Sequence, residues 1–370
     1  MDYDLTVIGA GIHGAAVAHE AAANGYRVLV LEQYAEAALG TSSKSSKLIH
    51  GGLRYLESVQ FKLVRECLQE RKRLLKEQPD LVSLTPFYIP VYRQTSRSPW
   101  LIACGLGLYT LLGGKGFRLL RKSEWPTMNG LRTSDLRAVF RYWDARTDDK
   151  RLTERIISEA VSRGAEVHYN TVFQSARCNP NACTVTFAKN GKEHSLTSRA
   201  LINATGPWVN DVLKDVTPVI KPLGMELVQG THIVVPGTLG NRVYYLEAPQ
   251  DQRAVFAMPW KDRIMIGTTE TAYRGDPAHV HPLESEISYL LETWNHHFEK
   301  KLNREDVIDS FVGLRVLPSS DGSAFKRSRE TRIHQDLSSP NILSIYGGKL
   351  TSHRTTAKHV LNRLPAAMRR

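Results

Sequence analysis

The sequence has few cysteines for its length, and they do not cluster. Only four occur among 370 residues, at Cys67, Cys104, Cys178 and Cys183, and no Cys-x-x-Cys motif or cysteine–histidine cluster suggests zinc. A chain of this size can bury a large core without covalent cross-links. We therefore expect no metal, no need for disulfides, and a cytoplasmic protein with reduced cysteines.

Long apolar runs are also absent. The longest stretch without charge covers residues 98–114 and is broken by Pro99 and several glycines, whereas a membrane-spanning helix needs about 20 mostly apolar residues. The chain opens with the acidic segment Met1–Asp4 rather than a basic region that leads into an apolar one. We therefore expect neither a transmembrane span nor a secretory signal.

Acidic residues are outnumbered. Asp and Glu total 37 against 49 Lys and Arg, which gives a net charge of +12, and 42% of the residues are hydrophobic. This composition excludes a disordered chain. The excess charge indicates a solvated basic surface, an anionic substrate or an anionic membrane face. No basic stretch is interleaved with aromatic residues, so we expect no nucleic acid partner.

A strand–turn–helix–strand pattern opens the chain. An apolar strand over residues 5–8 leads into Gly9, Gly11 and Gly14 of a Gly-x-Gly-x-x-Gly turn, then an alanine-rich helix over 15–23 and a strand over 27–31 that ends at Glu32. Gly9 permits the turn, Gly11 lets a pyrophosphate approach the backbone, and Gly14 lets the helix pack on the strand. Glu32 suits ribose hydroxyls and disfavours NADP. The motif alone does not separate NAD from FAD.

The rest of the chain alternates helices with β-rich segments. The patterns predict helices over residues 58–77, 151–163 and 284–300, and strands over 166–171, 184–187, 200–204, 254–258 and 264–266. A last strand over 343–346 turns through Gly347 and Gly348 into a helix over 351–364. We infer a nucleotide-binding domain completed by both ends of the chain, with a mixed substrate domain inserted.

Six further motifs decide between the cofactors. They are residues 41–56 (TSSKSSKLIHGGLRYL), 203–209 (NATGPWV), 230–236 (GTHIVVP), 266–269 (IGTT), 313–315 (GLR) and 346–351 (YGGKLT). Together they closely resemble the FAD-dependent glycerol-3-phosphate dehydrogenases, a branch of the D-amino-acid oxidase-like flavoproteins. The resemblance runs from about residue 3 to residue 365, in the order that the family has.

The resemblance implies an α/β fold with a Rossmann-like FAD-binding domain and an inserted mixed β-sheet substrate domain. We assign residues 1–80, 150–215 and 335–370 to the first domain, and 81–149 and 216–334 to the second. Family members usually continue into a helical C-terminal domain, whereas this chain stops at Arg370. The family also commonly has proline after the Gly-x-Arg-x segment, whereas here Val316 is followed by Leu317 and only then by Pro318.

The resemblance also implies which residues contact FAD. Gly9, Gly11, Gly14 and Glu32 match the positions that hold its ADP half, and the remaining matches follow the chain. They are Thr41, Ser42, Ser43, Lys47, Gly51, Gly52, Val172, Ala204, Thr205, Gly206, Gly348, Lys349, Leu350 and Thr351.

A phosphorylated polyol is the substrate class that the arginines favour. Guanidinium groups match phosphate oxygens in pairs, and a phosphomonoester carries nearly two negative charges at neutral pH. By resemblance, Arg54, Arg315 and Arg329 contact the phosphate ester, with Tyr55 beside Arg54. The alternative for each arginine is an ordinary surface ion pair. Arg327 and Arg332 flank Arg329, so a small shift of register would change that choice.

Three residues are candidates for catalysis. Arg54, together with Tyr55, would orient the glycerol. His232, in a strand-like segment, is the preferred base that removes the C2 hydroxyl proton, with His50 as a competitor. Lys349 follows two glycines before a helix, where an ammonium group suits the negative charge that a reduced flavin acquires. The resulting hypothesis is hydride transfer from C2 of sn-glycerol 3-phosphate to flavin N5, which gives dihydroxyacetone phosphate, with electrons passed to a quinone or another acceptor.

Residues 100–112 form an apolar segment flanked by Arg97, Lys115, Arg118, Arg121 and Lys122. Two interpretations stay open: a helix buried in the core, or a segment that lies in a membrane interface, which would place the protein peripherally on the inner face of the cell membrane. Two functional alternatives also remain: oxidation of another small anionic hydroxy or amino acid, and a catalytically silent FAD-binding protein.

Overall fold

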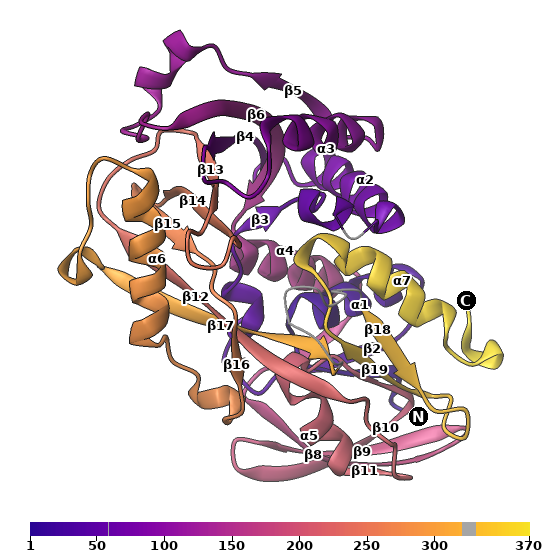
Figure 1. The fold of residues 1–370 in the computed structure, drawn as a ribbon. Helices are drawn as coiled ribbons and strands as arrows, with labels where there is room; N and C mark the ends of the chain where they lie inside the picture. Colours follow the sequence, from indigo (N-terminus) through magenta and orange to yellow (C-terminus); the bar gives the residue numbers. More distant parts are fainter. Residues whose placement is uncertain (58, 320–330) are drawn as a thin grey trace.

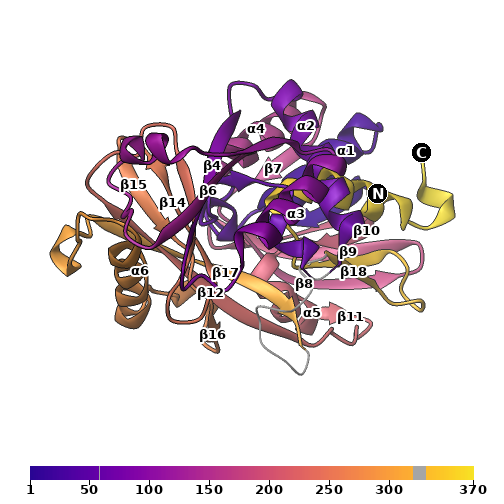
Figure 2. The same cartoon turned by 45° about the horizontal axis from the view of Figure 1, so that its top comes forward.

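The computed structural model describes residues 1–57, 59–319 and 331–370, and it divides them between two β-sheets. Helix α6 (Glu284–His297) lies at one end of the molecule and the two chain termini lie at the other, in both views (Figures 1 and 2). The predicted α/β class with two sheet domains is confirmed.

The first sheet is built around the N-terminal βαβ unit. Strand β1 (Tyr3–Ile8) leads through helix α1 (Ile12–Ala23) to β2 (Val28–Leu31), and β1 pairs in parallel with β2 and with β10 (Lys192–Asn203). The C-terminal strand β19 (Ile342–Tyr346) pairs with β10 on its other side. This sheet therefore contains strands from both ends of the chain. Its parallel strands are joined by crossover connections, since a short hairpin can join only antiparallel strands.

The remaining parts of the first sheet extend its edges and cover its faces. Its other strands are β7 (Glu166–His168), β8 (Thr171–Asn179), β9 (Ala182–Lys189), β11 (Val216–Thr217) and β18 (Arg332–Gln335). Its helices are α4 (Asp149–Ser162), α5 (Val209–Lys214) and α7 (His353–Asn362). Buried apolar side chains of α1, α4 and α7 form one core cluster with the strands.

One expectation about cysteine is wrong. Cys178 and Cys183 stand opposite each other on the antiparallel strands β8 and β9, with their Cα atoms 4.0 Å apart, and they form a disulfide. The hairpin turn between the two strands brings these cysteines together. The pair was not predicted because its spacing of five positions matches no cysteine motif. Cys67 and Cys104 are free thiols.

The second sheet is mixed, mostly antiparallel. It contains β3 (Leu48–Ile49), β4 (Val82–Tyr92), β5 (Lys115–Leu119), β6 (Leu136–Thr147), β12 (Met225–Val235), β13 (Val243–Glu247), β14 (Ala254–Trp260), β15 (Arg263–Gly267), β16 (Thr271–Tyr273) and β17 (Asp309–Pro318). Helix α6 packs on it through an apolar stripe. Strand β3 pairs with β6 although residues 48–49 fall within the range predicted for the first domain, because the chain crosses to the second sheet earlier than the motif pattern indicated.

Helices α2 (Phe61–Glu77) and α3 (Pro99–Leu111) lie beside the second sheet. On α3 only Leu106 and Tyr109 are buried, whereas Trp100 is 78% and Leu111 85% exposed. The interpretation of this segment as a helix buried in the core is therefore wrong, since several of its apolar side chains are exposed and others are only half-buried. Among the helices in the described part of the chain, none has both the length and the apolar character needed to cross a membrane.

Candidate functional site

A cavity of about 530 Å³ lies where the two sheets meet, and it gathers most of the residues that the motifs predicted. Its walls include Gly9, Gly11, Glu32, Thr41, Ser42, Gly52, Arg54, Tyr55, Val172, Ala204, Thr205, Gly206, His232, Arg315, Gly348, Lys349, Leu350 and Thr351. A cavity of this size with convergent polar groups is typical of a small-molecule or cofactor site.

The glycine turn forms one end of the cavity. Gly9 has a φ of +96° and no room for a side chain, because a Cβ there would lie 3.0 Å from the Ala204 carbonyl oxygen. The first helical amide of α1, that of Ile12, donates to the Ser42 hydroxyl at 2.9 Å. Gly14 does not line the cavity; it packs against the Gly9 carbonyl, which is the helix–strand contact that we predicted for it. This end therefore presents close backbone and a helix N-terminus, as a pyrophosphate needs.

Glu32 stands at the end of β2 with its side chain buried. Its carboxylate accepts the Ala10 amide at 2.6 Å and the Tyr34 amide at 3.0 Å, one on each oxygen. Burial raises the pKa of Glu32, and these amide hydrogen bonds oppose the rise. Each oxygen keeps a second lone pair, so the carboxylate can still accept ribose hydroxyls.

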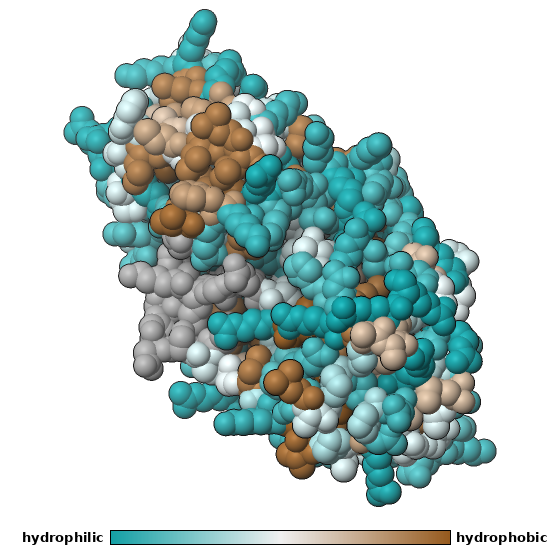
Figure 3. All heavy atoms as spheres, turned by 90° about the vertical axis from the view of Figure 1, so that its right-hand side faces the viewer, coloured by the Kyte–Doolittle hydropathy of each residue, from teal (hydrophilic) through white to brown (hydrophobic). Residues whose placement is uncertain are grey.

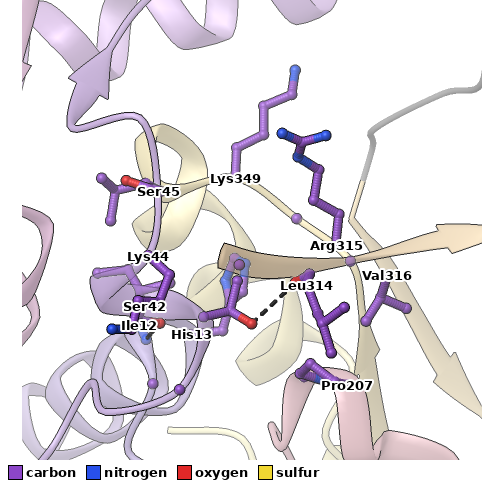
Figure 4. Close-up of a pocket in the computed structure, with 18 of the residues that line it drawn as sticks. Ile12, His13, Ser42, Lys44, Ser45, Pro207, Leu314, Arg315, Val316 and Lys349 are labelled. Atoms are coloured by element: carbon purple, nitrogen blue, oxygen red, sulfur yellow. Dashed lines mark hydrogen bonds between the residues drawn. The ribbon is translucent and has the colours of Figure 1, made fainter. Parts of the chain in front are cut away.

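Lys349 marks the other end of the cavity. Its Nζ atom is buried and has no hydrogen-bond acceptor within the described ranges, and it lies 3.7 Å from the centre of the Tyr55 ring. The Lys349 and Arg315 side chains extend in the same direction in the close-up view (Figure 4). A buried ammonium group without acceptors is costly, so this position fits a ligand with anionic or acceptor atoms.

Arg315, on β17, reaches the same cavity. Its guanidinium group donates to the Thr268 hydroxyl at 2.8 Å and to the Thr269 carbonyl at 3.3 Å. Both of these acceptors are uncharged. They orient the guanidinium group but do not neutralise its positive charge.

His232, on β12, is 2% exposed and stacks on Phe311 with ring centres 4.9 Å apart. Its Nε2 atom lies 2.9 Å from the Ser46 hydroxyl, and its Nδ1 atom has no partner among the described residues. Burial, with smaller contributions from Arg315 and Lys47, lowers the pKa of His232 to about 3. The imidazole is therefore neutral near pH 7 and has a lone pair that can accept a proton.

Several predicted residues are not brought into the cavity. Lys47 forms a buried ion pair with Asp149 at 2.6 Å and donates to the Ser43 carbonyl, and neither Lys47 nor Ser43 lines the site. Gly51 lies behind the wall, where its amide donates to the Tyr109 hydroxyl at 2.9 Å. Arg329 falls outside the described residues, so its position stays a prediction.

Other lining residues were not predicted. Arg253 forms a 2.7 Å ion pair with Glu270, and Tyr245 and His13 complete parts of the wall. His50, the competing candidate for the base, also lines the cavity. His13 stands inside the glycine motif, so its position there was a usable signal, whereas no sequence pattern marked Arg253. Within the described ranges, no group of three or more His, Cys, Asp or Glu is placed to hold a metal.

Comparison with known proteins gives concordant results. Residues 4–360 match the model of the FAD dependent oxidoreductase family. The chain is 40% identical to an aerobic glycerol-3-phosphate dehydrogenase of Escherichia coli and 38% identical to a D-erythritol 1-phosphate dehydrogenase of Brucella abortus; in each case 98% of this chain aligns with 73% of the relative. A glycerol-3-phosphate dehydrogenase from Bacillus halodurans, solved in complex with FAD, superposes with a TM-score of 0.79 at 27% identity, over 98% of this chain and 64% of that one.

Proposed function

Because this chain belongs to the family of FAD-dependent oxidoreductases, with glycerol-3-phosphate dehydrogenases among its relatives, we propose that it oxidises sn-glycerol 3-phosphate to dihydroxyacetone phosphate. The cofactor of the family is FAD. Its ADP half would be held by the turn at Gly9 and Gly11 and by Glu32, while Lys349 would face its reactive end. When bound, FAD supplies an acceptor for a hydride.

The observation that carries the proposal is the pair of cations at the Lys349 end of the cavity. Arg315 and Lys349 both reach the space there, and Arg54 lines it as well. A phosphomonoester dianion needs about two positive charges, and a guanidinium group can bind two of its oxygens at once. We assign Arg315 and Arg54 to the phosphate, keep Arg329 as a further candidate, and place Tyr55 beside the glycerol.

His232 is the base in this proposal. Its buried, neutral imidazole takes the proton of the C2 hydroxyl as the C2–H bond breaks. The bound phosphate dianion would add negative charge to a site that now holds Arg315 and Lys349, and this raises the pKa of the imidazole and strengthens it as a base. The Ser46 hydroxyl, 2.9 Å from Nε2, orients the ring.

The relatives favour a phosphorylated polyol, since one is named for glycerol 3-phosphate and another for erythritol 1-phosphate. Oxidation of a different small anionic hydroxy or amino acid remains the alternative reaction, and a silent FAD-binding protein the alternative function. We assign the second half-reaction to a quinone or another acceptor, and propose that α3 holds the protein peripherally on the inner face of the cell membrane.

Rapid mixing tests this proposal directly. Anaerobic enzyme that contains FAD should lose its oxidised flavin absorbance when mixed with sn-glycerol 3-phosphate, and Arg315→Gln should weaken the apparent affinity by about 10- to 100-fold, the value of one or two charged hydrogen bonds. Erythritol 1-phosphate, a 2-hydroxy acid and glycine serve as comparison substrates. Faster reduction by one of these would replace the substrate assignment, and reduction by none would favour the silent protein.

A further inference from the structure

A carboxylate behind the second sheet gathers an unusual number of donors. Glu286, in the first turn of α6, is 4% exposed. Its Oε2 atom accepts the Thr231 hydroxyl and the Gln229 amide, each at 2.6 Å, and the Leu283 backbone amide at 3.2 Å. Its Oε1 atom accepts the hydroxyls of Thr269 at 2.7 Å and Thr271 at 2.8 Å. The group is thus a fully partnered buried anion that joins three elements.

This carboxylate lies on the face of the sheet opposite the cavity. Side chains alternate along β12, so Gly230 and His232 border the cavity while Gln229 and Thr231 point to Glu286. Thr268 lines the cavity and Thr269 does not. Glu286 therefore cannot touch a ligand in the cavity, and any influence must pass through the strand.

A short path leads from Glu286 to Arg315. The Thr269 hydroxyl, which donates to Glu286, also accepts the Thr231 amide at 2.8 Å. The carbonyl of Thr269 and the hydroxyl of Thr268 accept hydrogen bonds from the Arg315 guanidinium group and help to orient it. Glu286 thereby fixes residues 268–269 against β12, and these residues fix the arginine.

We infer that Glu286 is a positioning residue for the anion-binding arginine, so that the carboxylate on one face of the sheet sets the affinity for phosphate on the other. The inference rests on the proposed phosphate role of Arg315. Glutamine at this position offers only one acceptor oxygen. When that oxygen takes the Oε2 position, where the Gln229 amide and the Thr231 hydroxyl donate, an NH₂ group takes the Oε1 position, and the Thr269 hydroxyl loses the acceptor to which it donates.

The test uses the intact flavoprotein and two readouts. Inorganic phosphate should perturb the flavin absorption band, and Glu286→Gln should raise its dissociation constant by about tenfold, the value of one displaced charged hydrogen bond. In turnover, KM for sn-glycerol 3-phosphate should rise by a similar factor with a smaller change in kcat. Glu284→Gln, on the same helix turn but with its side chain in an exposed ion pair with Arg304, should change neither value.

A double-mutant cycle separates positioning from general damage. Once Arg315→Gln is present, Glu286→Gln should cost little further phosphate affinity. Full additivity, or a lowered kcat with KM unchanged, would overturn the inference. If Glu286→Gln fails to fold, Thr269→Val against Thr269→Ser tests the same path, because only serine keeps the hydroxyl. Wild-type protein that binds no phosphate would also overturn it, whereas phosphate binding without turnover would refute only the proposed substrate.

Discussion

The ammonium group of Lys349 lies 3.7 Å from the centre of the Tyr55 ring, and no acceptor in the described part of the chain neutralises it. The two residues come from segments almost three hundred positions apart, residues 53–56 and the turn after β19. The aromatic face stabilises the cation without consuming its hydrogen-bond donors. The donors of the lysine therefore remain available to a ligand in the cavity, as its proposed role requires.

This relationship predicts the effect of removing the charge. Lys349→Met should slow flavin reduction by about 10²- to 10³-fold, which is the usual cost of losing one preorganised donor to developing charge. Rapid-mixing absorbance measures the rate, and the bound flavin content measured in the same sample shows whether the site stays intact. Lys358→Met on the exposed face of α7 is the matched control. A rate unchanged by Lys349→Met would remove the lysine from the mechanism.

A buried ion pair supports the wall of the cavity. Arg71 on α2 donates to Asp144 at 2.5 Å, and Asp144 also accepts the Tyr109 hydroxyl at 2.7 Å. Arg71→Leu leaves a buried carboxylate without its cation, so the free energy of unfolding should fall by about 3–5 kcal/mol. Chemical denaturation measures the loss. Arg73→Leu breaks two more exposed ion pairs on the same helix, those with Glu70 and Glu77. It should lower the free energy of unfolding by no more than about 1 kcal/mol, and equal losses for the two variants would contradict this account.

The sequence indicated the glycine-turn end of the cavity well because the determinants of that turn are local. Gly9, Gly11 and Glu32 lie within one βαβ unit, and the backbone conformation that the turn requires narrows the residue choice to glycine. Lys47 shows where local reasoning stops. It follows Ser46, whose hydroxyl meets His232, but its backbone has a φ of +59° and its side chain turns to Asp149 instead. A motif fixes which residues are near a site, and the backbone conformation fixes which of them face it.

Features set by tertiary packing were harder to predict. The sequence of α3 suits a core helix and a surface helix equally, and only the described packing shows that Trp100 and Leu111 face outward. The Glu286 network was missed because its donors come from β12, from β16 and the segment before it, and from the residue that precedes α6. No spacing in one segment encodes such a cluster.

Buried histidines predict acid sensitivity. His232, His297 and His353 are each at most 4% exposed, and burial lowers their pKa values from 6.5 to about 3, 4 and 4. Below pH 6.5 the unfolded chain binds protons that the folded protein does not, so stability is complete above pH 6.5 and falls as the pH drops towards 4. Each histidine contributes about 1.4 kcal/mol per pH unit in that window.

Thermal melting between pH 7.5 and pH 4.5 measures this slope. His297→Gln should flatten it, because glutamine can keep a hydrogen bond to the Glu247 carbonyl, which His297 now contacts at 2.8 Å, without titrating. His279→Gln alters a histidine whose side chain is 77% exposed and should leave the slope unchanged. A melting temperature that stays constant down to pH 4.5 would contradict the burial argument.

The apolar face of α3 predicts a membrane contact. The patch consists of exposed or half-buried residues of α3, including Trp100, Leu101 and Leu111, and space-filling Figure 3 shows apolar residues gathered near the top of one face, where α3 lies in Figure 1. The basic residues Lys115 and Arg118 on the adjoining strand suit anionic headgroups. Purified protein should cosediment with vesicles that contain anionic phospholipid, and less so at high salt.

The double variant Trp100→Ser/Leu111→Ser should weaken vesicle binding at least about tenfold, since each apolar side chain that leaves the membrane gives up about 1.5–3 kcal/mol when fully buried there. Leu337→Ser, which removes a leucine that is 95% exposed elsewhere, controls for a general change in surface hydrophobicity. If both variants bind vesicles as the parent does, α3 is not the contact. If the double variant alone loses vesicle binding and also loses turnover with a quinone, while flavin reduction by substrate is unaffected, then the second half-reaction depends on the membrane through this helix.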